Sequence, residues 1–280
     1  MTELAAPATS RRGRDLPVAV GVGVGLLVVV VASLFIVKEA FVVLAVLAVG
    51  AGLWELAQAF TRRGIHLPLL PLLVGSVGIL VSAYTAGPEA LFVAFMLTVG
   101  GAVIWRVLDG SGQPALRDAT GAAFAAAYVP FLGGFVMLML AAPDGPARVL
   151  LFILLPVASD TGGYVVGSLL GRHPLAPSVS PKKSWEGLVG SVVLACVVGV
   201  VGVQLGFGAA PLVGVVLGLA TVATATFGDL AESMLKRDLE LKDMGRLVPG
   251  HGGLLDRLDS LLLTAPAVYL LLSWLVPVVA

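Results

Sequence analysis

The stretch from Ser233 to Asp259, SMLKRDLELKDMGRLVPGHGGLLDRLD, concentrates residues that could do chemistry. It holds two Lys, three Arg, five acidic residues, one His and a Gly-Gly pair, in a chain that is 58% hydrophobic. Lys and Arg bind phosphates, carboxylates bind a hard cation, and glycines allow the backbone to approach a ligand closely. The stretch therefore predicts a site for an anionic, metal-bound substrate.

A helix with one polar face leads into this stretch. Polar residues recur there at spacings of three and four, which places them on one side of a helix that is otherwise apolar. They are Asp229, Glu232, Ser233, Lys236 and Arg237. Asp229 lies about two turns before Lys236, so we expect it to lie inside the membrane boundary that Lys236 marks.

The end of the stretch supplies backbone and carboxylate groups. His251, Gly252 and Gly253 could present N–H groups to an anion. Asp256 and Asp259 lie on one side of the entry to the last apolar segment, where Asp259 could also be a helix N-cap. A solvated loop would explain any one of these residues, but it does not explain the whole set.

A second polar motif, SPKKSWEG, begins at Ser180. Lys182 and Lys183 place two ammonium groups beside the start of a helix. Ser184 and Glu186 stand where an N-cap and a first-turn acid belong. Taken alone, the motif also fits a positively charged membrane anchor with an interfacial tryptophan.

A third motif, SDTGGYVVG, contains a deep acidic residue. Asp160 precedes Arg172 by twelve residues, which is about 18 Å along a helix. A carboxyl group at this depth must be neutral, bound to a metal or facing a wet cavity. Pro156, four residues earlier, can break the helix and free backbone carbonyl groups nearby. One helical face then carries Asp160, Gly163, Tyr164, Gly167 and Gly171.

Composition fixes the class of protein. Only 12% of the residues are charged, whereas about a quarter are charged in soluble domains. The single cysteine, Cys196, has no partner in the chain, so one chain can form neither a disulfide nor a cysteine-based zinc site. These numbers exclude an ordinary soluble domain and indicate a membrane protein.

Nine apolar segments approach the length of about 20 residues that crosses a bilayer as a helix. We therefore expect an all-α integral membrane protein with about nine transmembrane helices. The segments are Leu16–Val37, Ala40–Phe60, Leu67–Ala86, Ala90–Leu108, Ala119–Ala141, Val149–Leu170, Leu188–Leu205, Ala210–Met234 and Leu261–Ala280.

The distribution of positive charge predicts the orientation. Nine spans place 15 of the 17 Lys and Arg residues on one face and leave only Lys38 and Arg148 on the other. Short positive loops stay in the cytoplasm. We expect a cytoplasmic N-terminus, an outer C-terminus, and cytoplasmic loops at 171–187 and 235–260.

Three regions follow from this division. Residues 1–15 form a basic N-terminal segment that we expect to be disordered. Residues 16–141 form the N-terminal transmembrane helices. Residues 149–280 form a C-terminal catalytic region that carries both cytoplasmic loops.

The motifs together resemble a known family. KRDLELKDMGRLVPGHGGLLDRLD, preceded by GDLAES and SPKKSWEG, is similar to the signature of the phosphatidate cytidylyltransferases, also called CDP-diacylglycerol synthases. The resemblance covers roughly Ser159 to Asp259. Val248 stands where the family more often has Leu, Ile or Phe, and Gly163 stands where Ala is common. Both changes are conservative.

The resemblance implies a function in phospholipid biosynthesis. The family transfers the cytidylyl group of CTP to phosphatidate and forms CDP-diacylglycerol and pyrophosphate. It implies Mg²⁺ as cofactor, with a second cation as an option, and Asp229 and Asp256 as metal ligands. It also implies a multi-pass protein of the inner membrane, an active site facing the cytoplasm, and a homodimer.

Further residue roles follow from the same comparison. Lys236 and Arg237 join Asp229 and Asp256 as catalytic candidates. The candidate substrate-binding residues are Ser180, Lys182, Lys183, Lys242, Asp243, His251, Gly252, Gly253, Asp160 and Tyr164.

Other functions remain open at this point. The related CTP-dependent polyprenol kinases and archaeal lipid cytidylyltransferases share the lipid and nucleotide chemistry. A proton-coupled transporter would also carry intramembrane acids, but it would not need the polar loop. The string from Asp144 to Arg148 is one residue short of a CDP-alcohol phosphotransferase motif, and the chain has no Walker-type kinase loop. We expect no nucleic-acid partner.

Overall fold

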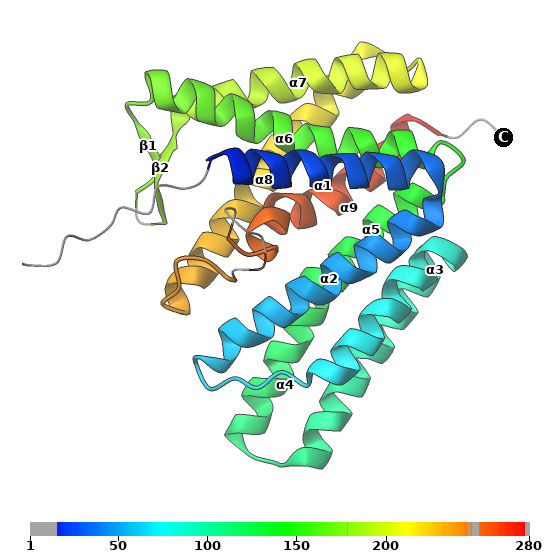
Figure 1. The fold of residues 1–280 in the computed structure, drawn as a ribbon, viewed down its shortest axis with the longest axis vertical. Helices are drawn as coiled ribbons and strands as arrows, with labels where there is room; N and C mark the ends of the chain where they lie inside the picture. Colours follow the sequence, from blue (N-terminus) through cyan, green and yellow to red (C-terminus); the bar gives the residue numbers. More distant parts are fainter. Residues whose placement is uncertain (1–15, 178, 246, 248–251, 278–280) are drawn as a thin grey trace, which may run out of the picture.

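Helices form nearly all of the structure, a computed structural model that describes residues 16–177, 179–245, 247 and 252–277 (Figure 1). The expected disordered segment 1–15 and the candidate residue His251 lie outside the described residues. Of the N-terminal helix, 16–36, the backbone is described throughout.

The helices follow one another with short connections. The N-terminal half contains α1 (Leu16–Ile36), α2 (Lys38–Thr61), α3 (Leu69–Asp109), α4 (Gln113–Ala126), the π-helix η1 (Ala127–Phe131) and α5 (Leu132–Ala141). The C-terminal half contains α6 (Gly145–Leu170), α7 (Trp185–Phe207), α8 (Pro211–Asp238) and α9 (Leu255–Leu275).

Seven helices in the described part of the chain are long and apolar enough to cross a membrane. They are α2, α3, the continuous run from α4 to α5, and α6 to α9. The expected all-α architecture is thereby confirmed, with several helices that could cross a membrane.

Helix α3 folds back on itself. Its backbone is non-helical at Gly87, where φ is 86°, and Pro88 follows. A Cβ atom placed on Gly75 would overlap the side chain of Thr98. On a straight helix these two residues would lie about 35 Å apart, so the two arms of α3 lie antiparallel. The expected segments Leu67–Ala86 and Ala90–Leu108 correspond to the two arms.

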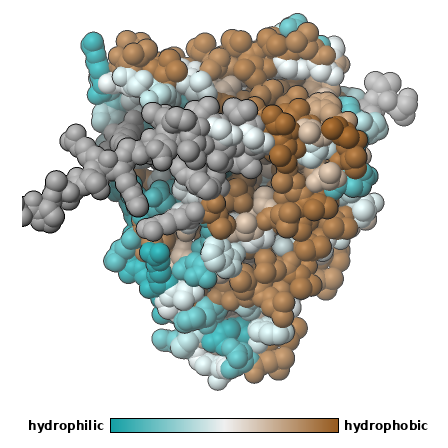
Figure 2. Space-filling view, in the orientation of Figure 1, coloured by the Kyte–Doolittle hydropathy of each residue, from teal (hydrophilic) through white to brown (hydrophobic). Residues whose placement is uncertain are grey.

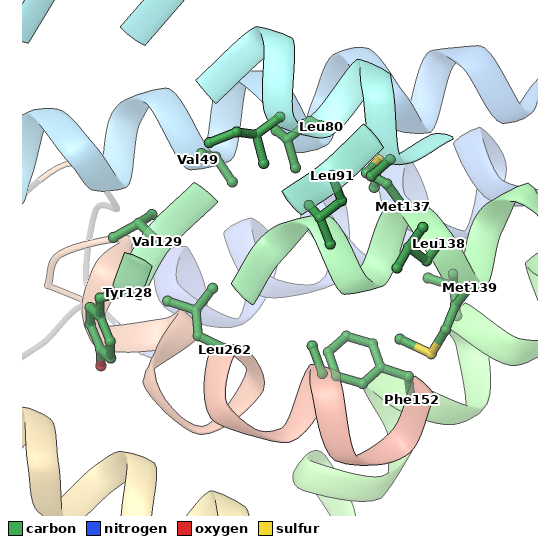
Figure 3. Packing of buried hydrophobic residues seen from close by; sticks show 14 of the residues in the cluster. Val49, Leu80, Leu91, Tyr128, Val129, Met137, Leu138, Met139, Phe152 and Leu262 are labelled. Atoms are coloured by element: carbon green, nitrogen blue, oxygen red, sulfur yellow. The ribbon is translucent and has the colours of Figure 1, made fainter. Parts of the chain in front are cut away.

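A buried apolar cluster joins the two halves. Val49 of α2, Leu80 of α3, Met137 of α5 and Phe152 of α6 belong to it together with Leu262 of α9 (Figure 3). The N-terminal helices therefore support α9, which begins at the candidate site.

Close backbone contacts hold the C-terminal helices together. A Cβ atom on Gly162 of α6 would overlap the carbonyl oxygen of Gly190 of α7, and a Cβ on Gly190 would overlap that of Gly162. Gly199 of α7 and Gly214 of α8 approach each other in the same way. Small residues permit this packing of helices in lipid.

The structure differs from the expectation in the connections. The expected loop 171–187 contains an antiparallel hairpin of two short strands, β1 (Pro174–Ala176) and β2 (Ser180–Ser184). Helix α6 continues through Pro156, so the break that this proline could cause does not occur. Helix α9 begins at Leu255, so Asp259 lies inside the helix and is not an N-cap.

Polar and apolar surfaces are separated. In Figure 2 hydrophobic side chains cover much of the upper and right parts of the visible face, and hydrophilic ones gather toward the left and lower left. The β1–β2 hairpin and the connection between α8 and α9 lie on this hydrophilic side (Figure 1).

Candidate functional site

A cavity of about 330 Å³ lies between α6, α7, α8 and the β1–β2 hairpin. Five of the candidate catalytic and substrate-binding residues line it: Asp160 and Tyr164 of α6, Ser180 and Lys183 of β2, and Asp229 of α8. Three motifs that are up to 69 residues apart in the chain thus meet at one cavity.

Lys183 and Asp229 form the central ion pair of this cavity. Lys183 lies near the end of β2, and Asp229 lies two turns from the end of α8. Ser184 follows as the N-cap of α7, because its hydroxyl accepts a hydrogen bond from the backbone N–H of Gly187 at 3.1 Å. The N-cap predicted at Ser184 is confirmed. It fixes the position of Lys183, the residue before it, at the end of the hairpin.

Glu186 fixes the base of the hairpin. Its carboxylate accepts hydrogen bonds from the backbone N–H groups of Arg172 at 3.1 Å and His173 at 3.3 Å. The ring Nδ1 of His173 lies 2.6 Å from the other carboxylate oxygen. The first-turn acid of α7 therefore holds both ends of the expected loop together.

A second ion-pair network lies one to two turns further along α8. The ammonium group of Lys236 lies 2.8 Å from Glu232 and 3.0 Å from Asp256 of α9. Asp256 also accepts backbone N–H groups from Met244 at 3.1 Å and Gly253 at 2.9 Å. Asp256 thus connects α8, α9 and both ends of the loop between them.

The two networks together hold more carboxylates than lysine ammonium groups to pair with them. Asp259 interacts electrostatically with both Asp229 and Glu232. The Oε1 atom of Glu232 is buried and has no hydrogen-bond partner among the residues that the structure describes. Negative charge without a full set of donors is the environment that a bound cation would stabilise.

The carboxylates suit Mg²⁺ only together with a substrate. Within the residues that the structure describes, no three Asp, Glu, His or Cys side chains form a metal site by themselves. Mg²⁺ is commonly held by one or two carboxylates, with water and substrate phosphates completing its shell. Asp229, with Asp259 near it, fits that pattern.

Glu55 of α2 belongs to the site although sequence reasoning missed it. The residue is buried, with 1% of its surface exposed. It accepts the backbone N–H of Leu255 at 2.9 Å and that of Leu247 at 3.4 Å. A Cβ atom on Gly245 would overlap it. Glu55 therefore binds the first turn of α9 and the loop before it.

The remaining candidates lie around the loop. Gly253 donates to Asp256, and Gly252 has a φ of 89°, which favours glycine. Arg237, Lys242 and Asp243 are exposed. Lys242 and Asp243 line a second cavity, separate from the one that Lys183 and Asp229 line. Lys182 is part of strand β2.

Comparisons with known proteins give one consistent result. A model of the cytidylyltransferase family matches residues 18–275. The phosphatidate cytidylyltransferase of Mycobacterium leprae is 39% identical over 95% of this chain and 90% of its own length. That of Mycobacterium bovis is 36% identical over 96% of this chain and 92% of its own length.

A more distant relative matches only part of the chain. The phosphatidate cytidylyltransferase of Haemophilus influenzae is 41% identical over 150 residues, which are 49% of this chain and 51% of that protein. The similarity to the mycobacterial proteins therefore extends well beyond what the more distant relative shares.

Proposed function

Because the chain belongs to the cytidylyltransferase family, we propose that the cavity between α6, α7 and α8 is where it joins its two substrates. The protein is a membrane nucleotidyltransferase that transfers the cytidylyl group of CTP to phosphatidate. The products are CDP-diacylglycerol, a precursor in phospholipid biosynthesis, and pyrophosphate.

One observation carries the choice of site. The ion pair between Lys183 and Asp229 joins the SPKKSWEG motif to the GDLAES motif at a cavity that also contains Asp160. Such a pair of an ammonium group and a carboxylate, at the edge of lipid, marks a candidate substrate site. A substrate phosphate can take the place of the carboxylate beside Lys183, and a cation can take the place of the ammonium group beside Asp229.

The reaction depends on the positioning of the two substrates more than on proton transfer. A phosphate oxygen of phosphatidate attacks the α-phosphorus of CTP, a new P–O–P bond forms, and the bond to pyrophosphate breaks. The attacking phosphate is already anionic, so no strong general base is needed. Lys183 and Lys236 offset the repulsion between the two phosphate groups and hold them in line, with Arg237 at the end of α8.

Asp229 and Asp256 are the proposed ligands of Mg²⁺, and a second cation is compatible with the neighbouring Glu232 and Asp259. When bound, a divalent cation neutralises charge on the attacking and leaving oxygens. In the structure Lys183 and Lys236 neutralise the two aspartates instead. We propose that these lysines turn toward phosphate when the aspartates bind metal.

The lipid reaches the cavity along α6. Tyr164 is 77% exposed and lines the cavity together with Asp160 one turn earlier. An exposed phenol on a helix in the bilayer can contact a lipid headgroup and its glycerol at once. Ser180 lies at the hairpin side, where the nucleotide phosphates enter. The Gly252 and Gly253 turn would approach the same nucleotide.

The membrane arrangement completes the proposal. The two arms of α3, together with α1, raise the seven apolar helices to nine spans. Nine spans place the positive loops and the active site at the cytoplasmic face of the bacterial inner membrane. The C-terminal helices carry catalysis. We also expect a homodimer, on the family resemblance alone.

Isotope transfer tests the reaction. The purified protein in detergent receives Mg²⁺, phosphatidate and CTP labelled at the α- or the γ-phosphate. We expect α-label in the chloroform-soluble lipid and γ-label only in pyrophosphate. Diacylglycerol, which lacks the attacking phosphate, should not accept label. Transfer of γ-label to lipid would instead make the protein a CTP-dependent lipid kinase.

A further inference from the structure

A second polar cavity, of about 540 Å³, lies between the end of α2 and the loop after α8. Trp54, Gln58 and Arg62 line it from the side of α2, at spacings of four that place them on one helical face. Lys242 and Asp243 line it from the loop. We call it the α2 cavity.

Unpaired polar side chains surround the α2 cavity. In the described part of the chain, Gln58 and Arg62 make no side-chain hydrogen bond or ion pair. The same holds there for Lys242 and Asp243. The other two acids of the lining are engaged, because Glu240 pairs with Arg63 at 2.8 Å and Glu55 holds the loop. The available groups are therefore three donors and two acceptors, with the Gln58 amide counted in both.

The charge of these groups indicates the kind of ligand. In the α2 cavity, two cationic side chains face the one available carboxylate, that of Asp243, and the neutral amide of Gln58. The catalytic cavity and its surroundings instead present Lys183 and Lys236 next to several acids. A mixed set of donors and acceptors recognises a flat polar group better than it recognises a triphosphate. Trp54 is 44% exposed and supplies an aromatic face for stacking.

We propose that the α2 cavity binds the cytosine base of CTP, an inference that rests on the proposed function. Cytosine presents an amino donor beside two acceptors, and carboxylates accept from that amino group. Asp243 would accept from it, Gln58 and Arg62 would donate to the two acceptors, and Trp54 would stack on the ring.

The position of the cavity relative to the catalytic carboxylates supports this role. Asp243 and Met244 line the α2 cavity, and the backbone N–H of Met244 donates to Asp256 at 3.1 Å. From Asp256 the network continues through Lys236 to Glu232, one turn from Asp229. Asp229 and Lys236 are seven residues apart on α8, or about 10 Å. This row links the α2 cavity to the catalytic cavity, and in this proposal the phosphates of a nucleotide with its base in the α2 cavity lie on the side of Lys236 and Asp229.

Equilibrium binding of CTP and UTP to the purified protein tests the proposal without relying on turnover. We expect Trp54→Ala to weaken binding of both nucleotides about tenfold, because a stacked aromatic ring is lost. Asp243→Asn should lower the preference for CTP over UTP at least about fivefold, since an amide can donate to the uracil carbonyl. Trp105→Ala, another half-exposed tryptophan on α3, is the matched control and should leave both affinities unchanged.

Two results would overturn the inference. One is an unchanged affinity for CTP in Trp54→Ala together with an unchanged CTP preference in Asp243→Asn. The other is a parallel loss of nucleotide binding, phosphatidate affinity and thermal stability, which would assign a structural role to these residues. Because binding is measured directly, a wild-type protein that binds CTP but transfers no α-label would contradict the proposed reaction and leave the base site in place.

Discussion

Two lysine–aspartate pairs set the charge balance at the scale of single residues. Lys183 neutralises Asp229, and Lys236 neutralises Asp256. Partly buried carboxylates without such partners would be costly to keep ionised. The same two aspartates can therefore stay charged before substrate arrives and remain available to a cation.

Substituting Asp229 and Asp256 one at a time tests the role of each in binding metal and in holding the loop. Asp229→Asn keeps the shape but removes the charge that would hold Mg²⁺, so turnover should fall at least about 100-fold. Asp256→Asn should lose a similar factor and also loosen the loop, because Met244, Gly253 and Lys236 all bind its carboxylate. Steady-state rates at varied Mg²⁺ concentration measure the effect.

Asp259→Asn is the informative comparison for these variants. Asp259 interacts with Asp229 and Glu232, and among the described residues the backbone N–H that its carboxylate accepts is that of Ser260 in α9. A loss of Mg²⁺ dependence in Asp259→Asn, with normal behaviour of Asp256→Asn, would transfer the metal role from Asp256 to Asp259.

Glu55 should be essential for the loop although it lies in the other half of the chain. Glu55→Gln places an amide N–H₂ against N–H donors, so we expect a loss of about 1–3 kcal/mol in unfolding free energy and lower turnover. Thermal unfolding in detergent and initial rates measure both. Glu89→Gln, at an exposed position, is the control, and equal behaviour of the two variants would contradict the anchoring role.

Sequence reasoning could find Lys183 and Asp229 but not Glu55. The first two stand in motifs where several charged residues lie together in an apolar chain, so their types and spacing already indicate phosphate and metal chemistry. Glu55 is a lone acid in an apolar helix, and its backbone partners lie 192 and 200 residues away. Such a contact leaves no local pattern.

At the scale of elements, glycine contacts between α6 and α7 hold the walls of the proposed catalytic cavity. Gly162→Ala should destabilise the protein by about 1–3 kcal/mol, because its Cβ would overlap the carbonyl oxygen of Gly190. Gly78→Ala is the matched control, since a Cβ there meets nothing within 4 Å. Thermal unfolding in detergent distinguishes them, and equal midpoints would show that the helices separate easily.

The helices were predictable and their irregular connections were not. The apolar segments predicted α2 and α6 to α9 within a few residues at most ends, because the length of a bilayer span constrains them strongly. The exception is α9, where Asp256 and Asp259 belong to the helix and place its start six residues earlier. The β1–β2 hairpin depends on pairing across a turn and on Glu186. Its strands are also too short to leave a recognisable pattern in the sequence.

At the scale of the whole molecule, the topology is open to direct test. In a Cys196→Ala background, cysteines replacing Arg172 and Lys242 should react with an impermeant thiol reagent only from the cytoplasmic side. A cysteine replacing Glu89 should react only from outside. The reason is the excess of positive charge on one face. Reaction of positions 172 and 242 from opposite sides would contradict a single active site.

The anchoring of the loop by Glu55 has a consequence for how the protein is made. A contact across 200 residues closes only after the intervening helices are in place, and such non-local contacts form late in folding. Helix α2 leaves the ribosome early, whereas α9 leaves it after all other described helices. A chain still under synthesis therefore holds a buried acid without its donors, and we expect the enzyme to become competent for catalysis only when α9 docks against α2.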